Sequence, residues 1–330
     1  MKQKKKSKRI AAAQKAIKAY PKSGARTIAK ALFDESPSLW GSVESARSTI
    51  RYLSGQLGEH KPANQQNVRA PRKPGYTELL PVSRKNNNPP VKIGPGKILI
   101  LSDLHIPYHD LPSLKAALHY GADHVKPETV VLLGDIIDCY QVSAWDRRPS
   151  RIGIKGELES LNLFFQTLCN MFPESRIIWK EGNHEERMNR YILTNAPALW
   201  DVKGVNLREM SGAEGYGIEY VNERRRIDAG RLSMYHGHEL QGRASVNPAR
   251  SQFLQTCIST IAGHCHRTST HLESDDNGKL IGSWSMGCLC DMRPEYAPIN
   301  KWNHGFGVAH INDDGSFHVE NKIIIDGEVV

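Results

Sequence analysis

The spacing of apolar side chains follows a helical period in the first part of the chain. Residues 10–20 have a helix-like composition, and residues 25–35 and 42–55 repeat apolar side chains at helical spacing. Proline and glycine separate these segments, and Gly55 follows the third one, at a position where helices commonly end. The pattern predicts a small all-α domain, which we place at residues 1–60.

A segment without periodicity follows. Residues 56–95 are dense in Pro, Asn and Lys and alternate neither with period 2 nor with period 3.6. This composition is typical of a linker, or of an extended arm that lies on a neighbouring domain. We place the linker at residues 61–95.

After residue 96 the pattern changes to apolar runs that end in polar turns. Eight such runs predict strands, at 97–103, 129–135, 176–186, 231–238, 257–266, 279–287, 306–313 and 317–326. Helical patterns occupy residues 112–125 and 158–172. Strands that alternate with helices in this way predict one layered α/β domain with a large β contribution, over residues 96–330.

Charge divides the chain near the same place. Residues 1–95 carry 20 Lys and Arg against 5 Asp and Glu, whereas residues 96–330 carry 24 against 30 and hold 13 of the 14 histidines. The lysine-rich residues 1–9 are expected to form a disordered arm. A front half this basic favours a polyanionic partner, and nucleic acid is the partner we expect.

Three short helices of which the third is basic are typical of a helix-turn-helix module. Arg47 and Arg51 lie one turn apart, opposite the apolar face of the third helix, and are the nucleic-acid-binding candidates. The alternative is a small protein-docking domain whose arginines are simply solvated.

Two classes of protein are disfavoured by composition. No run of 18 apolar residues exists, and Lys15 and Lys18 interrupt the only stretch that resembles a signal peptide, so we expect no membrane association and a cytoplasmic location. Six cysteines in 330 residues predict free thiols rather than a disulfide framework. The pair Cys288-x-Cys290 lacks the two-residue spacer of a zinc knuckle, which argues against a metal role.

Five of the apolar runs end in residues that commonly bind metal ions. In chain order these ends are Ser102-Asp103-Leu104-His105, Gly134-Asp135-Ile136-Ile137-Asp138, Glu181-Gly182-Asn183-His184-Glu185, His236-Gly237-His238 and Gly263-His264-Cys265-His266. Strand ends converge at one edge of an α/β sheet. Carboxylate, imidazole and amide ligands suit Mn, Fe, Zn, Ni or Co, and there are more of them than one tetrahedral ion can use. We therefore expect two divalent ions, manganese first among these metals.

In this order the motifs resemble the calcineurin-like metallophosphoesterase superfamily, whose signature is D-x-H, G-D-x-x-D, G-N-H-[ED], H and G-H-x-H. The resemblance covers residues 97 to about 312 and does not reach residues 1–95. It implies a four-layer αββα sandwich with the metals at one edge. The layout is also similar to phage- or prophage-encoded members in which a helical segment precedes the phosphoesterase domain, and such a member would work in the cytoplasm of a bacterial host.

The resemblance implies a role for each matching residue. Asp103, His105 and His266 would bind one ion, Asp135 would bridge both, and Asn183, His236 and His264 would bind the second. His184 would be the catalytic histidine that touches the substrate phosphate or the leaving oxygen. Asp138 is expected to orient its neighbours. His238 has no counterpart in the signature and is expected to be structural, with a substrate contact as the alternative.

The chemistry expected of such a site is direct displacement at phosphorus. Two cations about 3.5–4 Å apart hold a bridging water and lower its pKa towards neutrality, and the resulting hydroxide attacks in line. His184, if protonated, would assist the leaving oxygen, which is typically worth ~10²–10⁴ in rate. Because no phosphoenzyme is required, we expect inversion at phosphorus.

The motifs indicate the reaction class but not the substrate. Protein phosphatases of the superfamily carry G-D-x-x-D-R-G, and the arginine of that motif is absent here, whereas Arg187 half-matches their G-N-H-E-x-R. Arg147, Arg148 and Arg187 are the expected phosphate contacts. Trp145 either stacks on a base or fills a core.

A two-metal phosphoesterase joined to a basic helical front is most simply explained as a nuclease that acts on DNA. The alternatives are a phosphomonoesterase acting on proteins or nucleotides, and a cyclic-nucleotide or dinucleotide hydrolase. A DNA-binding protein without catalytic activity is a more remote alternative, because no expected ligand position has been lost.

Overall fold

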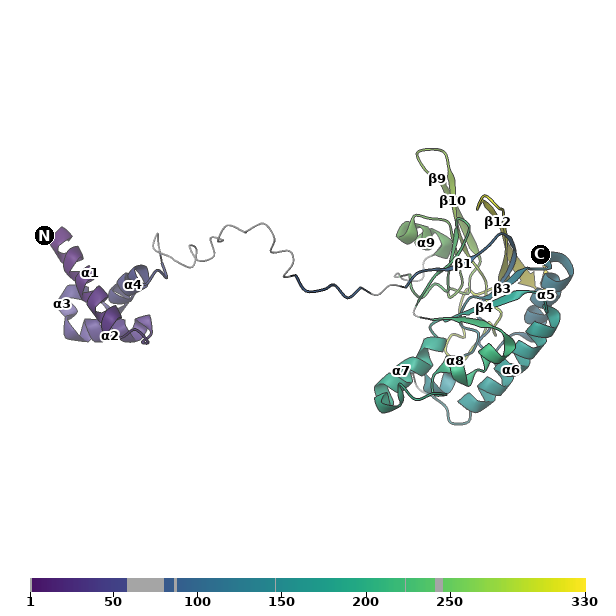
Figure 1. Cartoon of the computed structure of the whole chain (residues 1–330), viewed down its shortest axis with the longest axis horizontal. Helices are drawn as coiled ribbons and strands as arrows, with labels where there is room; N and C mark the ends of the chain where they lie inside the picture. The colour runs from purple at the N-terminus through teal and green to yellow at the C-terminus, as the bar shows by residue number, and fades with distance from the viewer. Residues whose placement is uncertain (1, 58–79, 86–87, 146, 223, 241–245) are drawn as a thin grey trace. The chain divides into compact units, whose positions relative to one another are not determined.

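The computed structural model describes residues 2–57, 80–85, 88–145, 147–222, 224–240 and 246–330. The chain forms two compact units, residues 1–85 and 86–330, coloured purple to blue and blue to yellow in Figure 1. Much of the expected linker, at residues 61–79 and 86–87, lies outside the described residues. Near the end of the expected linker, β1 (Val91–Ile93) pairs with a strand of the second unit, as an extended arm on a neighbouring domain would.

The first unit is helical and has its own core. Its helices are α1 (Lys2–Ala19), α2 (Ala25–Glu35), α3 (Pro37–Trp40) and α4 (Val43–Leu53). Ile28, Trp40 and Ile50 are among the buried residues that these helices pack together. The short helix α3 lies in the segment where proline and glycine separate the second and third helical patterns.

The expectation of a disordered lysine-rich arm at residues 1–9 is wrong, because α1 begins at Lys2. Lysine is a good helix former, since its unbranched side chain loses little freedom in a helix. Arg9 also joins this segment to the core by donating hydrogen bonds to the carbonyl oxygens of Leu39 at 2.6 Å and Trp40 at 3.2 Å.

The second unit contains two sheets. The seven-stranded sheet has the order β13-β12-β11-β2-β3-β4-β5, and the six-stranded sheet has the order β1-β6-β7-β8-β10-β9. Their strands are β2 (Gly96–Leu101), β3 (Thr129–Leu132), β4 (Arg176–Lys180), β5 (Glu219–Val221), β6 (Ile227–Ala229), β7 (Leu232–Tyr235), β8 (Thr260–Ala262), β9 (Ser269–Ser274), β10 (Leu280–Ser285), β11 (His304–Ile311), β12 (Phe317–Ile325) and β13 (Glu328–Val329), together with β1.

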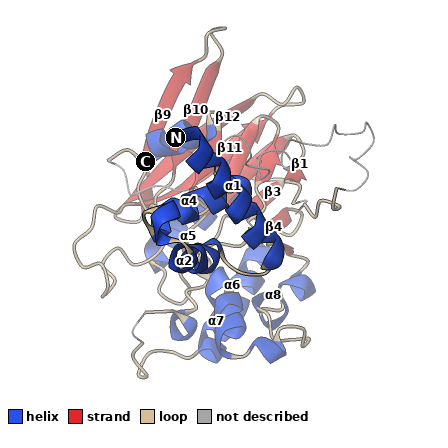
Figure 2. Ribbon diagram, turned by 90° about the vertical axis from the view of Figure 1, so that its left-hand side faces the viewer, coloured by secondary structure: helices blue, strands red, loops and turns tan. Residues whose placement is uncertain are grey.

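Helices lie on the outer side of each sheet. The α-helices of this unit are α5 (Leu111–Tyr120), α6 (Ile154–Met171), α7 (Glu185–Asn195), α8 (Leu207–Met210) and α9 (Pro248–Thr256). Short turns of helix are η4 (Gly121–Val125), η5 (Tyr140–Val142), η6 (Pro197–Leu199) and η7 (Ala213–Tyr216). Helices α6, α7 and α8 lie on one side of β3 and β4 (Figure 2), and α9 contacts β8, β9 and β10. The predicted four-layer αββα arrangement is confirmed.

Alternation along β2 explains why its sequence is continuously apolar. Leu99 and Leu101 pack with the helices, whereas Ile98 and Ile100 pack into a second core between the two sheets. A strand buried on both faces has no polar side, and its sequence therefore reads as an apolar run.

Among the described residues, none of the helices combines the length and apolar composition that a bilayer crossing requires. All six cysteines are free.

The direction of the strands decides where the motifs meet. Strands β2, β3, β4 and β5 run parallel, as do β7 and β8. The five motif loops follow the carboxyl ends of β2, β3, β4, β7 and β8, where parallel strands place their ligands.

Candidate metal centre

The loops after β2 and β3 are joined by backbone hydrogen bonds. The N–H of His105 donates to the carbonyl of Asp135 at 2.9 Å, and the N–H of Ile106 donates to the carbonyl of Ile136 at 2.8 Å. The N–H of Asp138 returns to the carbonyl of Ile106 at 3.1 Å. This pairing brings the D-x-H and G-D-x-x-D motifs together.

Five of the seven expected ligands have a left-handed backbone conformation. They are Asp103, His105, Asp135, His264 and His266, with φ between 51° and 63°. Residues with a Cβ adopt this region rarely, at a cost of order 1–3 kcal/mol each, and such residues cluster at functional sites. The surrounding fold therefore holds these side chains in place against their local preference.

Two glycines allow the motif loops to approach each other. Gly134 has φ of 90°, and a Cβ on it would lie 2.5 Å from Nδ1 of His236. A Cβ on Gly182 would lie 2.5 Å from the backbone nitrogen of Asp135. Both distances are shorter than van der Waals contact, so larger residues there would push the ligands apart.

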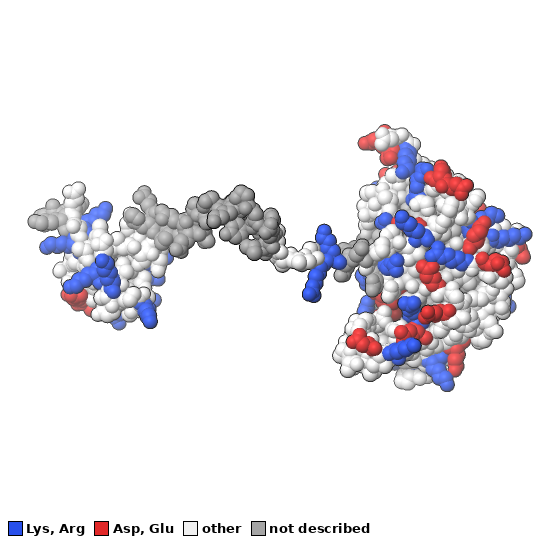
Figure 3. Space-filling model, viewed as in Figure 1, with Lys and Arg blue, Asp and Glu red and all other residues white. Residues whose placement is uncertain are grey.

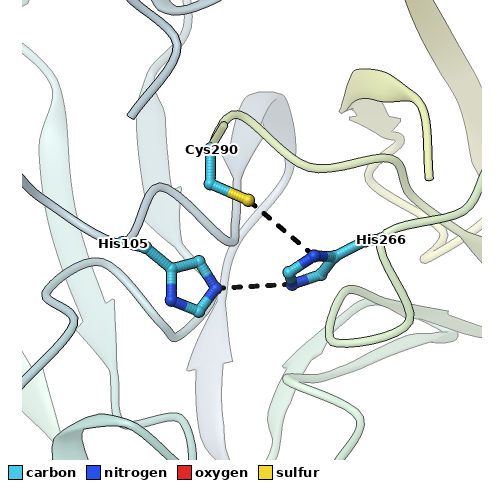
Figure 4. A group of neighbouring side chains, drawn as sticks. All are labelled: His105, His266 and Cys290. Carbon is cyan, nitrogen blue, oxygen red and sulfur yellow. Dashed lines mark hydrogen bonds between the residues drawn. The ribbon is translucent and has the colours of Figure 1, made fainter. Parts of the chain in front are cut away.

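The first group of expected ligands meets around Nε2 of His105. This atom lies 3.3 Å from Nε2 of His266 and 3.8 Å from Oδ2 of Asp135. Nε2 of His266 lies 3.1 Å from Oδ1 of Asp103. Figure 4 shows the imidazoles of His105 and His266 facing each other. Asp103, His105 and Asp135 present ligand atoms within 4.8 Å of one another, close enough to hold one ion.

The second group meets on the other side of Asp135. Nε2 of His236 lies 3.2 Å from Oδ2 of Asp135 and 3.2 Å from Oδ1 of Asn183. The exposed His264 completes a group in which the ligand atoms of Asp135, His236 and His264 lie within 4.8 Å of one another. The structure thus brings all seven expected ligands into one region.

Hydrogen bonds behind two of the imidazoles select the nitrogen that faces the cluster. Nδ1 of His236 donates to the carbonyl of Leu133 at 2.8 Å, and Nδ1 of His105 donates to Oδ1 of Asp138 at 3.0 Å. In each ring this leaves Nε2 as the lone-pair nitrogen that a cation needs. Asp138 therefore acts on the cluster through His105.

Asp135 provides the test of whether cations fit. Its Oδ2 is buried and lacks a well-aligned hydrogen bond from the described residues, while its Oδ1 accepts one from the N–H of His184 at 2.9 Å. A buried carboxylate oxygen that lacks a well-aligned donor is costly. Because Oδ2 lies between the two ligand groups, a pair of divalent cations fits this chain's donor set.

The charges of the cluster also favour cations. Burial by itself raises the pKa of Asp103, but His266 outweighs it and lowers the pKa to about 2. Burial lowers the pKa of His236 and His266, but Asp135 and Asp103 respectively raise these pKa values to about 10. Protonated imidazoles thus balance the buried carboxylates, and a bound cation would displace those protons.

His184 lies at the amino end of α7, between the cluster and a cavity. Its Nδ1 lies 3.0 Å from the carbonyl oxygen of Asp138, which accepts its hydrogen bond. Its Nε2 lies 2.7 Å from Nη2 of Arg187, whose Nη1 donates to the same carbonyl at 2.8 Å. Arg187 therefore fixes the plane of the His184 ring and covers its outer nitrogen.

Glu185, the last residue of the third motif, has a structural role. Its side chain is fully buried and accepts hydrogen bonds from the backbone N–H groups of Asp135 at 2.9 Å, Ile136 at 2.7 Å and Gly182 at 2.8 Å. It thereby joins the second and third motif loops. The final acidic position of the G-N-H-[ED] motif was the available signal.

Cys290 is brought to the cluster although its sequence spacing argued against a metal role. Its sulfur lies 3.8 Å from Nδ1 of His266, as Figure 4 shows, and Cys290, His105 and His266 present ligand atoms within 4.8 Å of one another. The spacing rule applies to chelation within one turn. Here the fold supplies the partners from distant segments.

His238 faces carboxylates at the edge of the cluster. Its Nε2 lies 2.9 Å from Oε1 of Glu186 and its Nδ1 lies 3.4 Å from Oε2 of Glu239. Glu186 in turn accepts a hydrogen bond from Arg224 at 2.8 Å. His238 thus connects the loop after β7 to α7.

A cavity of about 940 Å³ opens beside His105 and His184. The three arginines expected to contact phosphate, Arg147, Arg148 and Arg187, all line it. Arg147 donates to the carbonyl of Gln141 at 2.8 Å, Arg148 pairs with Glu295, and Arg187 is the one that contacts His184. Trp145 also lines the cavity and is 81% exposed, so it does not fill a core.

The nucleic-acid-binding candidates of the first unit lie half-buried on α4. Nη1 of Arg47 lies 3.3 Å from the carboxylate of Glu44, and Arg51 is in the last turn of the helix. Lysines of α1, among them Lys5, Lys8 and Lys15, are exposed. In the view of Figure 3, basic side chains predominate over this unit, whereas both signs mix over the second.

Comparison with known proteins finds a family match within the second unit. A family model described as calcineurin-like phosphoesterase matches residues 96–271. The gene 54 proteins of Mycobacterium phages L5 and D29 are 28% and 27% identical over 241 residues, which cover 69% of this chain and 92% of each phage protein. A crystal structure of a Vps29 single mutant from Entamoeba histolytica matches 71% of this chain and 96% of that one, with a TM-score of 0.37 and 16% identity.

Proposed function

The chain belongs to the calcineurin-like phosphoesterase family and is a metal-dependent phosphoester hydrolase, and from this premise we propose that it uses two divalent cations to cleave phosphodiester bonds in nucleic acid. The observation that carries the two-metal part is Oδ2 of Asp135, which is buried, lacks a well-aligned partner among the described residues and lies between the two ligand groups.

Each ligand group has a set of residues for one cation. Asp103, His105 and His266 would hold the first, Asn183, His236 and His264 the second, and Asp135 both. The cations would supply charge neutralisation at the phosphate and an acidified water. Mixed oxygen and nitrogen donors suit manganese, the metal we propose, and equally admit Fe, Zn, Ni or Co.

His184 and Arg187 would act on the substrate from the side of the cavity. The hydrogen bond to Asp138 holds Nδ1 of His184, so only Nε2 can turn towards a phosphate or leaving oxygen. Arg187 lies against that nitrogen and presents a guanidinium group that suits two phosphate oxygens at once. We propose direct displacement with inversion at phosphorus.

Two features support nucleic acid as the substrate. The cavity beside His184 is lined by Arg147 and Arg148 in addition to Arg187, and the helical unit at residues 1–60 carries many exposed basic side chains that suit a phosphate backbone. Arg47 and Arg51 are the contacts we propose in a helix-turn-helix-like unit. The phage relatives support action in the cytoplasm of a bacterial host.

A phosphomonoesterase is the second candidate. Arg187 favours this candidate. It lies beside His184, at the position of the arginine in the G-N-H-E-x-R motif of the protein phosphatases.

Rates on four substrates test the proposal. The full chain loaded with manganese is incubated with methyl p-nitrophenyl phosphate, p-nitrophenyl phosphate, single-stranded DNA and duplex DNA. We expect the diester and at least one DNA to be hydrolysed faster than the monoester. A preference for the monoester with intact DNA would instead support the second candidate, and no turnover of any diester would overturn the proposal.

A further inference from the structure

Two loops from distant parts of the chain frame the cavity beside His184. The first contains residues 143–145 and 147–151, and the second contains residues 290–296. Glu295 of the second loop pairs with both Arg148 and Arg151 of the first, the latter at 3.1 Å. These ion pairs hold the two loops together across the rim of the cavity.

Aromatic rings support the arginines from the floor of the cavity. The guanidinium of Arg151 lies 5.0 Å from the ring centre of Tyr108 and 5.4 Å from that of Tyr140. The hydroxyl of Tyr140 accepts a hydrogen bond from the backbone N–H of Arg148 at 3.1 Å. The floor is therefore built from residues that already contact one another.

The rim of the cavity differs from its floor, because each of the two loops presents one large aromatic ring that is exposed to solvent. Trp145 of the first loop is 81% exposed and Tyr296 of the second is 68% exposed, and both line the cavity. The ring of Tyr296 lies 6.3 Å from that of Trp302, which in turn lies 4.2 Å from the ring of His266. The aromatic side of the cavity thus continues to an expected metal ligand.

We propose that this cavity binds an unpaired nucleobase next to the scissile phosphate, with Trp145 and Tyr296 as the rings on which the base stacks. The proposal rests on the proposed phosphodiesterase activity and names the part of its substrate that the cavity recognises. Exposed aromatic side chains stack on bases without reading their sequence. The base must be unpaired because neighbouring pairs cover both of its faces in a duplex.

Size and charge agree with this occupant. A cavity of about 940 Å³ is of the size that holds small ligands, so it can accept a nucleotide but not the width of a double helix. Its lining has more arginines than carboxylates, the arginines being Arg147, Arg148, Arg151, Arg187 and Arg293 and the carboxylates Asp138, Asp291 and Glu295. A site for phosphate alone would need the arginines but not the exposed rings.

The test compares substrates with and without a base at the cleaved position. The full chain with manganese is given a single-stranded oligonucleotide, the same oligonucleotide with one tetrahydrofuran abasic nucleotide beside the labelled linkage, and methyl p-nitrophenyl phosphate. We expect Trp145→Ala to lower kcat/KM on the intact strand roughly tenfold, as loss of one stacked base predicts, and to leave kcat/KM on the abasic strand unchanged. With the wild type, kcat/KM on the abasic strand should be as low as kcat/KM of Trp145→Ala on the intact strand.

A matched control and a second variant complete the design. Trp200 is 45% exposed and does not line this cavity, so Trp200→Ala should change neither rate. Tyr296→Ala should repeat the result of Trp145→Ala. A 3′,5′-cyclic nucleotide in the same series distinguishes a free nucleotide from a strand. The one that is the substrate of this site will be hydrolysed, and its kcat/KM will fall in Trp145→Ala.

Several outcomes would overturn the inference. They are an equal effect of Trp145→Ala on all substrates, no cost of the abasic nucleotide, cleavage of covalently closed duplex as fast as of single strands, or the same Trp145 dependence on a phosphoserine peptide. Failure of the proposed function looks different, because then methyl p-nitrophenyl phosphate and every other diester remain intact with the wild type.

Discussion

Asp135 divides its two carboxylate oxygens between the fold and the cluster. Oδ1 accepts the backbone N–H of His184, and Oδ2 faces the imidazoles of His105 and His236. The backbone of Asp135 is itself held by Glu185. Asp135 thus connects its own motif loop to three of the other four, and for this reason a single isosteric change there is informative.

Asp135→Asn is expected to remove both cations and to lower diester hydrolysis by roughly 10³-fold or more, because the amide keeps the size of the side chain but loses the charge between the two ligand groups. Metal content after dialysis and kcat/KM on methyl p-nitrophenyl phosphate are the measurements. Asp123→Asn, at an exposed position, is the control. Two equivalents of metal in Asp135→Asn would contradict the bridging role.

His184→Gln is expected to keep both cations and to slow turnover by ~10²–10⁴, because glutamine fills the space but cannot transfer a proton. The same metal assay and the same diester distinguish the two variants. If the metal content of His184→Gln falls with its activity, His184 belongs among the ligands.

At the scale of elements, α6 carries a buried carboxylic acid behind the cavity. Oε1 of Glu157 accepts the backbone N–H of Tyr140 in η5 at 3.0 Å, and Oε2 has no hydrogen-bond partner among the described residues. Burial, followed by the charge of Asp138, raises the pKa of Glu157 to about 8. The folded protein therefore binds this proton more tightly than the unfolded chain.

This raised pKa predicts a pH-dependent stability. Ionisation of the buried Glu157 lowers the stability of the folded protein. This destabilisation is absent below the ordinary pKa of about 4.5, grows as the pH rises towards 8, and is complete above pH 8. Glu157→Gln should therefore melt higher than the wild type at pH 9, by roughly 5 °C or more, and the difference should vanish towards pH 4. Melting curves in the presence of chelator give the comparison, and the exposed Glu159→Gln on the same helix should show no such trend.

Element boundaries that depend on local pattern were predictable. The apolar run at 97–103 became β2, and the patterns at 25–35 and 158–172 became α2 and α6. β1 was missed because three residues are too few to show a period, and the pairing with β6 that makes them a strand is not local. α7 was missed because it begins at Glu185, inside the run at 176–186 that predicts a strand followed by a polar turn.

At the scale of the whole molecule, each unit has a core of its own. The helical unit packs around Trp40, and the second unit packs in two layers on either side of the seven-stranded sheet. Because the family match lies within the second unit, hydrolysis should not require the first.

Deletion of residues 1–85 is accordingly expected to leave the hydrolysis of methyl p-nitrophenyl phosphate unchanged. DNA binding should weaken roughly tenfold or more at low salt, and the slope of log affinity against log salt should become flatter, because fewer phosphate contacts release counterions. Fluorescence anisotropy over a salt series measures both. Equal binding by the two proteins would assign the helical unit to another task, such as docking to a protein.

The order of the strands that carry the motifs, the types of ligand at their ends and the resemblance to a family could be read from the sequence, because periodicity and motif spacing are properties of neighbouring residues. Four facts required the folded chain: which imidazole nitrogen faces the cluster, that Glu185 joins two loops, that Cys290 reaches His266, and that loops about 140 residues apart enclose one cavity. Those facts depend on how two sheets pack and on which strand ends are neighbours, and no local pattern records either.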